Sequence, residues 1–196
     1  IQLTYNTSLG LYDGFTSVGQ FAESGTWKIN NLWLKDKAQN STWIYSNDLK
    51  NVSGSLIVPN TGNSDSKVPV QNSLNVRYDA NRKGFYATAN ITDDLSGVSN
   101  ASLNLKSPNG KVNLSIHLTY NTSLGLYDGF TSVSQYAESG TWKINNLWLR
   151  DKAQNSTHIY SNDLKNVSGS LIVPNTGNSD SKVPVQNSLN VRYDAN

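Results

Sequence analysis

The sequence predicts an all-β fold made of antiparallel β-sandwich repeats, and three observations support this fold class. Short segments alternate apolar and polar residues with a period of two, as half-buried strands do. Turn-forming residues interrupt these segments about every ten residues, a spacing typical of sandwiches. The chain contains no segment that keeps the 3.6-residue apolar period of an amphipathic helix.

The clearest strand lies in the middle of the chain, at residues 85–91. Its sequence is FYATANI, with apolar residues at positions 85, 87, 89 and 91 and more polar ones between them. This alternation predicts a strand with one buried face.

A hairpin follows this strand. The segments 101–106 and 111–118 both alternate, and they flank the sequence SPNG at 107–110. Pro108 presets its own φ and Gly110 can adopt the positive φ that such turns require. The sequence therefore predicts an antiparallel pair of strands closed by this turn.

The next strand, at 141–150, changes the phase of its alternation. Trp142 and Ile144 share one face, whereas Leu147 and Leu149 share the other. A bulge at 145–146 restores a single buried face, so we expect one there. Two shorter strands are expected after it, at 156–160 and 170–173. The predicted buried set includes Leu103, Leu105, Leu114, Ile116, Trp142 and Ile144.

The composition limits the class of protein. The 196 residues include 27 Asn and 26 Ser but no Cys, which excludes a disulfide scaffold. The 16 Lys and Arg nearly balance the 14 Asp and Glu, so the net charge of +2 does not favour binding to nucleic acid. No apolar run approaches the roughly 18 residues of a membrane span. We therefore expect neither nucleic acid nor a membrane span.

A long internal repeat sets the domain organisation. Residues 1–81 (the first copy) recur as residues 116–196 (the second copy), and 76 of the 81 positions are identical. The five differences are Gln2/His117, Gly19/Ser134, Phe21/Tyr136, Lys35/Arg150 and Trp43/His158. The period of 115 residues is long enough to close its own core, unlike a solenoid unit. The repeat predicts an array of domains.

A polar segment between two prolines marks the expected domain boundary. Residues 59–67 form this linker, and residues 174–182 form its copy. On this basis 68–173 is a complete repeat, 1–58 is the C-terminal half of one, and 183–196 is the first strand of a following one. We expect the half repeat to be completed by a longer chain or by a neighbouring copy docked head to tail.

Four motifs carry a family resemblance. They are ITDDLSGV at 91–98, LKSPNG at 105–110, ESGTWKI at 138–144 and LRDKAQN at 149–155. Their order resembles that of bacterial immunoglobulin-like tandem repeats of large secreted and cell-surface proteins, apart from Gln154, where such turns usually carry Gly. The resemblance implies an immunoglobulin-like sandwich and an extracellular, non-catalytic role as a stalk, spacer, lattice, filament or adhesin module.

The residues themselves also argue against an enzyme. His117 and His158 each replace a different residue in the other copy, and the chain has no Cys. A His-dependent triad or a Cys/His metal site would therefore exist in one copy at most. The acidic residues occur mostly singly in turns, where capping explains them.

The adjacent pair Asp93 and Asp94 is the exception, and it suggests calcium. Neighbouring carboxylates repel unless they are solvated or bridged by a hard cation. Asp151 completes this candidate Ca²⁺ site if its turn lies at the same end of the sandwich. The alternative is a pair of solvated aspartates in an ordinary loop.

Aromatic residues suggest a second, competing function. Trp27, Trp33 and Trp43 fall within the hairpin at 26–46, so Trp43, or His158 at the matching position, could contact a surface glycan. The alternative is that these indoles complete the core, with Trp43 alone exposed. The two function hypotheses are thus a structural spacer and a carbohydrate-binding or adhesive module.

Overall fold

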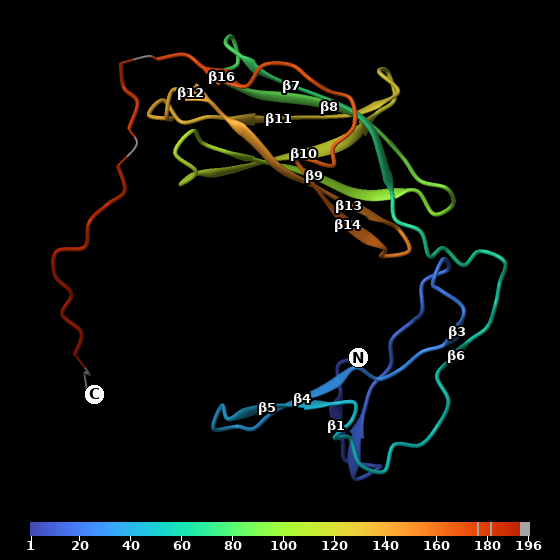
Figure 1. Cartoon of the computed structure of the whole chain (residues 1–196). Coiled ribbons are helices and arrows are strands. Elements are labelled where there is room, and N and C mark those ends of the chain that lie inside the picture. Colours follow the sequence, from blue (N-terminus) through green and yellow to red (C-terminus); the bar gives the residue numbers. More distant parts are fainter. Residues whose placement is uncertain (176, 181, 193–196) are drawn as a thin grey trace. The chain divides into compact units, whose positions relative to one another are not determined.

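The computed structural model describes residues 1–175, 177–180 and 182–192, and every regular element within them is a β-strand (Figure 1). The predicted all-β class is confirmed. None of the described segments is a helix of the length and apolarity that crossing a membrane requires. The chain divides into two compact units. The first unit comprises Ile1–Pro69, Asp93–Val98 and Arg150–Ser156, and the second comprises Val70–Thr92, Ser99–Leu149 and Thr157–Asn196.

One large, curled sheet dominates the second unit (Figure 1). Its strands are β7 (Val70–Asp79), β8 (Gly84–Thr92), β9 (Val98–Lys106), β10 (Asn113–Asn121), β11 (Leu126–Ser132), β13 (Lys143–Asp151), β14 (Ser156–Tyr160) and β15 (Val167–Ser168). Their order is β14-β13-β9-β10-β11-β8-β7-β15. The sheet is mixed because β15 pairs with β7 in parallel, whereas β7–β8, β8–β11, β11–β10 and β10–β9 are antiparallel.

The strand and the hairpin predicted in the middle of the chain are present. Strand β8 buries alternate residues from Phe85 to Ile91. Strands β9 and β10 pair in antiparallel register, and Ser107 closes their loop by accepting and donating backbone hydrogen bonds with Gly110 and Val112. Gly110 has a φ of 74°, as the turn requires.

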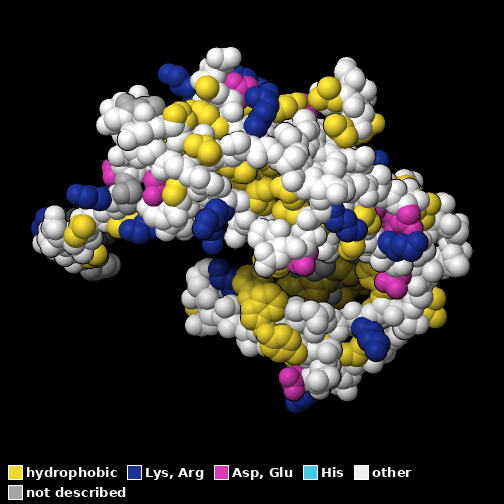
Figure 2. Space-filling model, turned by 45° about the horizontal axis from the view of Figure 1, so that its top comes forward, with side chains coloured by type: hydrophobic (Ala, Val, Ile, Leu, Met, Phe, Trp, Pro, Cys, Tyr) yellow, Lys and Arg dark blue, Asp and Glu magenta, His cyan; other side chains and the backbone are white. Residues whose placement is uncertain are grey.

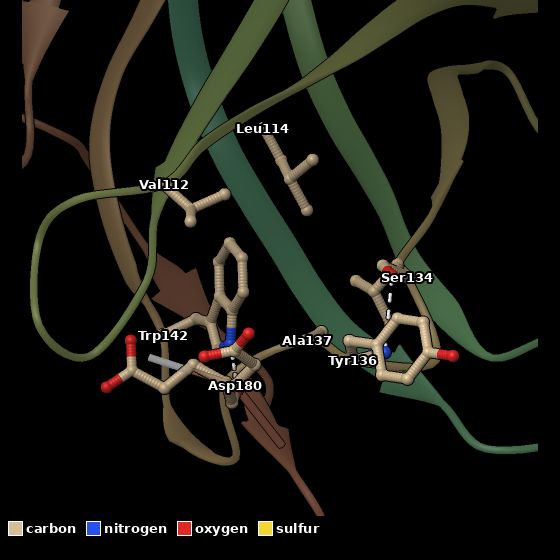
Figure 3. A pocket seen from close by; sticks show the side chains of 9 residues that line it. Val112, Leu114, Ser134, Tyr136, Ala137, Trp142 and Asp180 are labelled. Atoms are coloured by element: carbon tan, nitrogen blue, oxygen red, sulfur yellow. Dashed lines mark hydrogen bonds between the residues drawn. The ribbon is translucent and has the colours of Figure 1, made fainter. Parts of the chain in front are cut away.

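The hydrophobic core is formed by residues on one face of the curled sheet. Four residues of the predicted buried set are fully buried, namely Leu103, Leu105, Ile116 and Trp142. Leu114 and Ile144 are only partly buried. Leu114 and Val112 line a hollow of about 160 Å³ and face the Trp142 ring (Figure 3). Ile144 lies at the start of β13, before the buried residues of that strand.

The strand expected at 141–150 is divided into two strands. The strand is interrupted at Trp142, between β12 (Gly140–Thr141) and β13. Strand β12 pairs with β16 (Ile172–Val173) rather than with the large sheet. Asn145 and Asn146, the expected bulge, lie within β13. Because β12 and β13 pair with different strands, Trp142 and Leu147 can both be buried.

A buried glutamine fastens the edge of the sheet. Gln71 is 2% exposed, and its amide donates to the Lys165 carbonyl (2.6 Å) and accepts from the Lys165 N–H (2.9 Å). The Leu74 N–H donates to the Asn166 carbonyl, which extends this connection into the parallel pairing of β7 with β15.

Residues 1–58 of the first copy form three separate two-stranded ribbons in the first unit, whereas β7 of the same copy belongs to the large sheet. The ribbons are β1 (Thr4–Asn6) with β2 (Leu11–Asp13), β3 (Gly25–Thr26) with β6 (Ile57–Val58), and β4 (Asn31–Lys35) with β5 (Ser41–Tyr45). The second copy repeats the registers. Tyr5 opposite Tyr12 corresponds to Tyr120 opposite Tyr127. Local pairing is thus encoded within each copy.

Burial, in contrast, differs between the copies. The Trp27 and Trp142 indoles both donate to a glutamate carbonyl four residues earlier, yet Trp27 is 48% exposed and Trp142 2%. Trp142 packs on Phe85, with ring centroids 5.4 Å apart. Phe85 belongs to residues 82–115, which occur once in the chain. The first unit therefore keeps hydrophobic side chains exposed, and Figure 2 shows hydrophobic side chains, in yellow, gathered at the molecular surface.

We predict that Trp142→Ala and Trp27→Ala differ sharply in their effect on stability. The Trp142 substitution should lower the free energy of unfolding by about 4 kcal/mol, because it opens a cavity in the core. The Trp27 substitution should cost far less, since half of that side chain is already in water. Urea denaturation followed by circular dichroism measures both, and equal losses would show that Trp27 is buried in solution.

The duplicated glutamine provides a second matched pair. Gln71→Ala should cost about 2 kcal/mol, because the Lys165 backbone loses both hydrogen-bond partners. Gln186, the same residue in the second copy, is exposed, so Gln186→Ala should leave the unfolding midpoint unchanged. A comparable loss in both variants contradicts a specific role for the Gln71 amide.

Candidate metal centre

Three aspartates from distant parts of the sequence meet in the first unit. Asp65 lies in the linker, Asp93 directly follows β8, and Asp151 ends β13. One carboxylate oxygen from each lies within 4.8 Å of the other two. We call these three residues the aspartate cluster.

The loop after β8 folds around the Asp93 carboxylate. Its Oδ2 atom accepts hydrogen bonds from the Gly97 N–H (2.7 Å) and, more weakly, from the Leu95 N–H (3.4 Å). Gly97 has a φ of 81°, a conformation that suits glycine. These bonds fix the carboxylate while its second oxygen, Oδ1, is buried without a hydrogen-bond partner.

Asp151 is held by the turn that follows β13. Its Oδ1 accepts from the Asn155 backbone N–H and its Oδ2 from the Asn155 side-chain amide, both at 2.8 Å. Gln154 takes a φ of 80° in this turn. Gln154 therefore adopts the left-handed conformation that glycine adopts most readily.

The first copy builds the same turn at Asp36. Its two oxygens accept from the Asn40 backbone (2.9 Å) and side chain (2.8 Å), and Gln39 has a φ of 74°. The side-chain hydrogen bond from Asn40 is the main cause that lowers the pKa of Asp36. The turn thus forms without the other members of the aspartate cluster.

Asp65 connects the linker with both loops. Its Oδ2 accepts from the Ser96 N–H (3.0 Å), and its carbonyl accepts from the Asn155 amide (3.0 Å). Asp65 is only 3% exposed, and burial by itself raises its pKa. Hydrogen bonds from Ser96 and Lys67, with the Lys67 charge, outweigh burial and lower the pKa below 3.8. Asp65 is therefore a carboxylate at neutral pH.

Asp94 lies outside this arrangement. Its Oδ2 is 2.6 Å from the Lys67 ammonium, and this hydrogen bond and charge raise the pKa of Lys67. The structure thus brings together two of the expected ligands, Asp93 and Asp151, and places Asp65 where Asp94 was expected. Nothing in the linker sequence signals this, because a single Asp in a polar linker is ordinary.

The expected glycan-contacting residues lie on two separate sheets. Trp43 is 56% exposed and neighbours Trp33 across β4 and β5, with ring centroids 6.1 Å apart. His158 on β14 is also exposed and takes the same place beside Trp148, at 6.3 Å. Each copy therefore presents one aromatic pair, and the pairs differ chemically.

Comparisons with known proteins return no match: no family model, no curated protein and no solved structure is significantly similar to the chain.

The turn at Asp151 yields a prediction. Gln154→Gly should raise the free energy of unfolding by about 1 kcal/mol, because a non-glycine residue is strained at positive φ. Ala153→Gly, one position earlier and outside the positive-φ set, should lower stability instead. Urea denaturation checks both, and a loss in the Gln154 variant contradicts the left-handed turn.

Proposed function

We propose that the chain is a structural spacer of a repetitive extracellular surface protein, built from immunoglobulin-like sandwich repeats and without catalysis. The motif resemblance and the internal duplication support this role. So does the curled sheet, which buries one face as a sandwich repeat must. Its partners in this proposal are neighbouring copies of the same repeat, arranged head to tail.

The joint between repeat and linker is the observation that carries the proposal. In the first copy the Asp65 N–H donates to the Phe21 carbonyl at 3.0 Å. In the second copy the Asp180 N–H donates to the Tyr136 carbonyl, also at 3.0 Å. Each linker therefore leaves the preceding half repeat along the same path.

Side-chain contacts reproduce the joint as well. The Ser24 N–H donates to the Ser64 hydroxyl at 3.0 Å, and Ser139 and Ser179 repeat this contact at the same distance. A free polar linker behaves as a flexible coil. A docked linker instead gives every repeat the same direction, which is what a spacer of constant rise needs.

A second candidate function is carbohydrate binding. The exposed, neighbouring indoles of Trp33 and Trp43 favour it, because sugars stack on exposed aromatic rings. The spacer remains the better supported proposal, since His158 replaces the indole in the other copy. A glycan array separates the two, and binding that Trp43→Ala abolishes would favour the carbohydrate-binding module.

Small-angle X-ray scattering tests the spacer. Lengthening the chain by one, two and three further 115-residue periods should raise the maximum dimension linearly, because each docked linker fixes the direction of the next repeat. Ser64→Ala and its equivalents remove the hydroxyl acceptor and should weaken this linear growth. Growth with the square root of the number of repeats contradicts the proposal.

A further inference from the structure

We propose that Asp65, Asp93 and Asp151 bind one Ca²⁺ ion, which holds the linker against the two loops. The binding site stands on the geometry of the first unit alone. Its role in stiffening the joint rests on the proposed spacer function.

The spacing of the carboxylates fits one coordination sphere. Ca²⁺ binds oxygen at about 2.4 Å, so two of its ligands lie at most about 4.8 Å apart. The three oxygens of the aspartate cluster satisfy this limit. All three donors are carboxylate oxygens, which a hard cation prefers, and none is nitrogen or sulfur.

Burial of the clustered carboxylates favours a bound cation. Asp151 is fully buried and Asp65 is 3% exposed. Buried like charges at this distance repel and lose their hydration, which a cation offsets. The Lys67 charge helps to lower the pKa of Asp65, while the Lys67 ammonium forms its ion pair with Asp94.

An orphaned oxygen is the independent sign of a ligand. Asp93 Oδ1 has no hydrogen-bond partner although it is buried, whereas Oδ2 of the same carboxylate is bonded within the loop. Buried carboxylate oxygens almost always have a partner. A cation bound by the aspartate cluster supplies the missing one.

The ion would connect three segments that come from distant parts of the sequence. Asp65 belongs to the linker, Asp93 connects to β8 and β9 through its loop, and Asp151 connects to β13. Hydrogen bonds already link them: the Ser96 N–H and the Asn155 amide donate to Asp65. The Lys152 N–H donates to the Gly97 carbonyl. Calcium would add bonds to all three at once and stabilise the docked linker.

Isothermal titration of the EDTA-treated full chain with CaCl₂ tests the site. We expect one ion per chain and a melting temperature that rises by several degrees at saturating Ca²⁺, because the ion binds only the folded state. Asp93→Asn should weaken binding at least about tenfold, since charge count sets the affinity of calcium sites. Mg²⁺ should bind more weakly, because it demands a smaller, octahedral shell.

Two matched variants complete the experiment. Asp36→Asn changes the same turn in the first copy, and Asp94→Asn removes the exposed neighbour, so both should bind Ca²⁺ as the unaltered chain does. Circular dichroism checks that each variant folds. If Asp93→Asn does not fold, Asp65→Asn in the linker replaces it.

Three results would overturn the proposal. They are no heat and no thermal shift with Ca²⁺, equal weakening by Asp36→Asn and Asp93→Asn, and equal affinity for Mg²⁺, which would indicate general screening. Scattering of the lengthened chains in Ca²⁺ and in EDTA separates this proposal from the spacer. Linear growth without calcium binding leaves the spacer intact, whereas calcium binding without linear growth contradicts the spacer alone.

Discussion

The fold depends on one constraint: the apolar face of each copy can be buried only by strands that lie outside that copy. Trp142 is buried because Phe85 packs against it. Trp27 has the same neighbours in sequence and the same indole hydrogen bond, yet half of it remains in water. Hydrophobic burial is therefore a property of the whole repeat, whereas hydrogen-bonded ribbons form within each copy.

Locally encoded turns place the functional groups. The Asp–Lys–Ala–Gln–Asn turn has the same hydrogen bonds at Asp36, where the surroundings are open, as at Asp151, where the carboxylate is buried. The linker likewise docks through the same atoms in both copies. Each copy can thus form the Asp–Lys–Ala–Gln–Asn turn and the docked linker by itself. These elements form an aspartate cluster only where a loop like that of Asp93 lies beside them.

Much of the fold could be predicted because its signals are local. The alternation at 85–91 and the turn at Gly110 depend on neighbouring residues, and both are present. Partner exchange is not local, so the alternation at 141–150 did not predict the break at Trp142. The aspartate cluster shows the same limit. Asp94 is adjacent to Asp93 in sequence, but Asp65 reaches it only because the linker folds back through Ser96.

Two of the positions that differ between the copies show which contacts depend on the backbone and which on side chains. Phe21 and Tyr136 hold the linker through their backbone carbonyls, so either side chain preserves the joint. Trp43 on β5 and His158 on the edge strand β14 are exposed and pack beside equivalent indoles. No difference falls on an aspartate of the cluster or on the turn glutamines. The two copies therefore share the backbone contacts that set the path of the linker. Ser134, which replaces Gly19, adds one local contact in the second copy, because its hydroxyl accepts from the Tyr136 N–H.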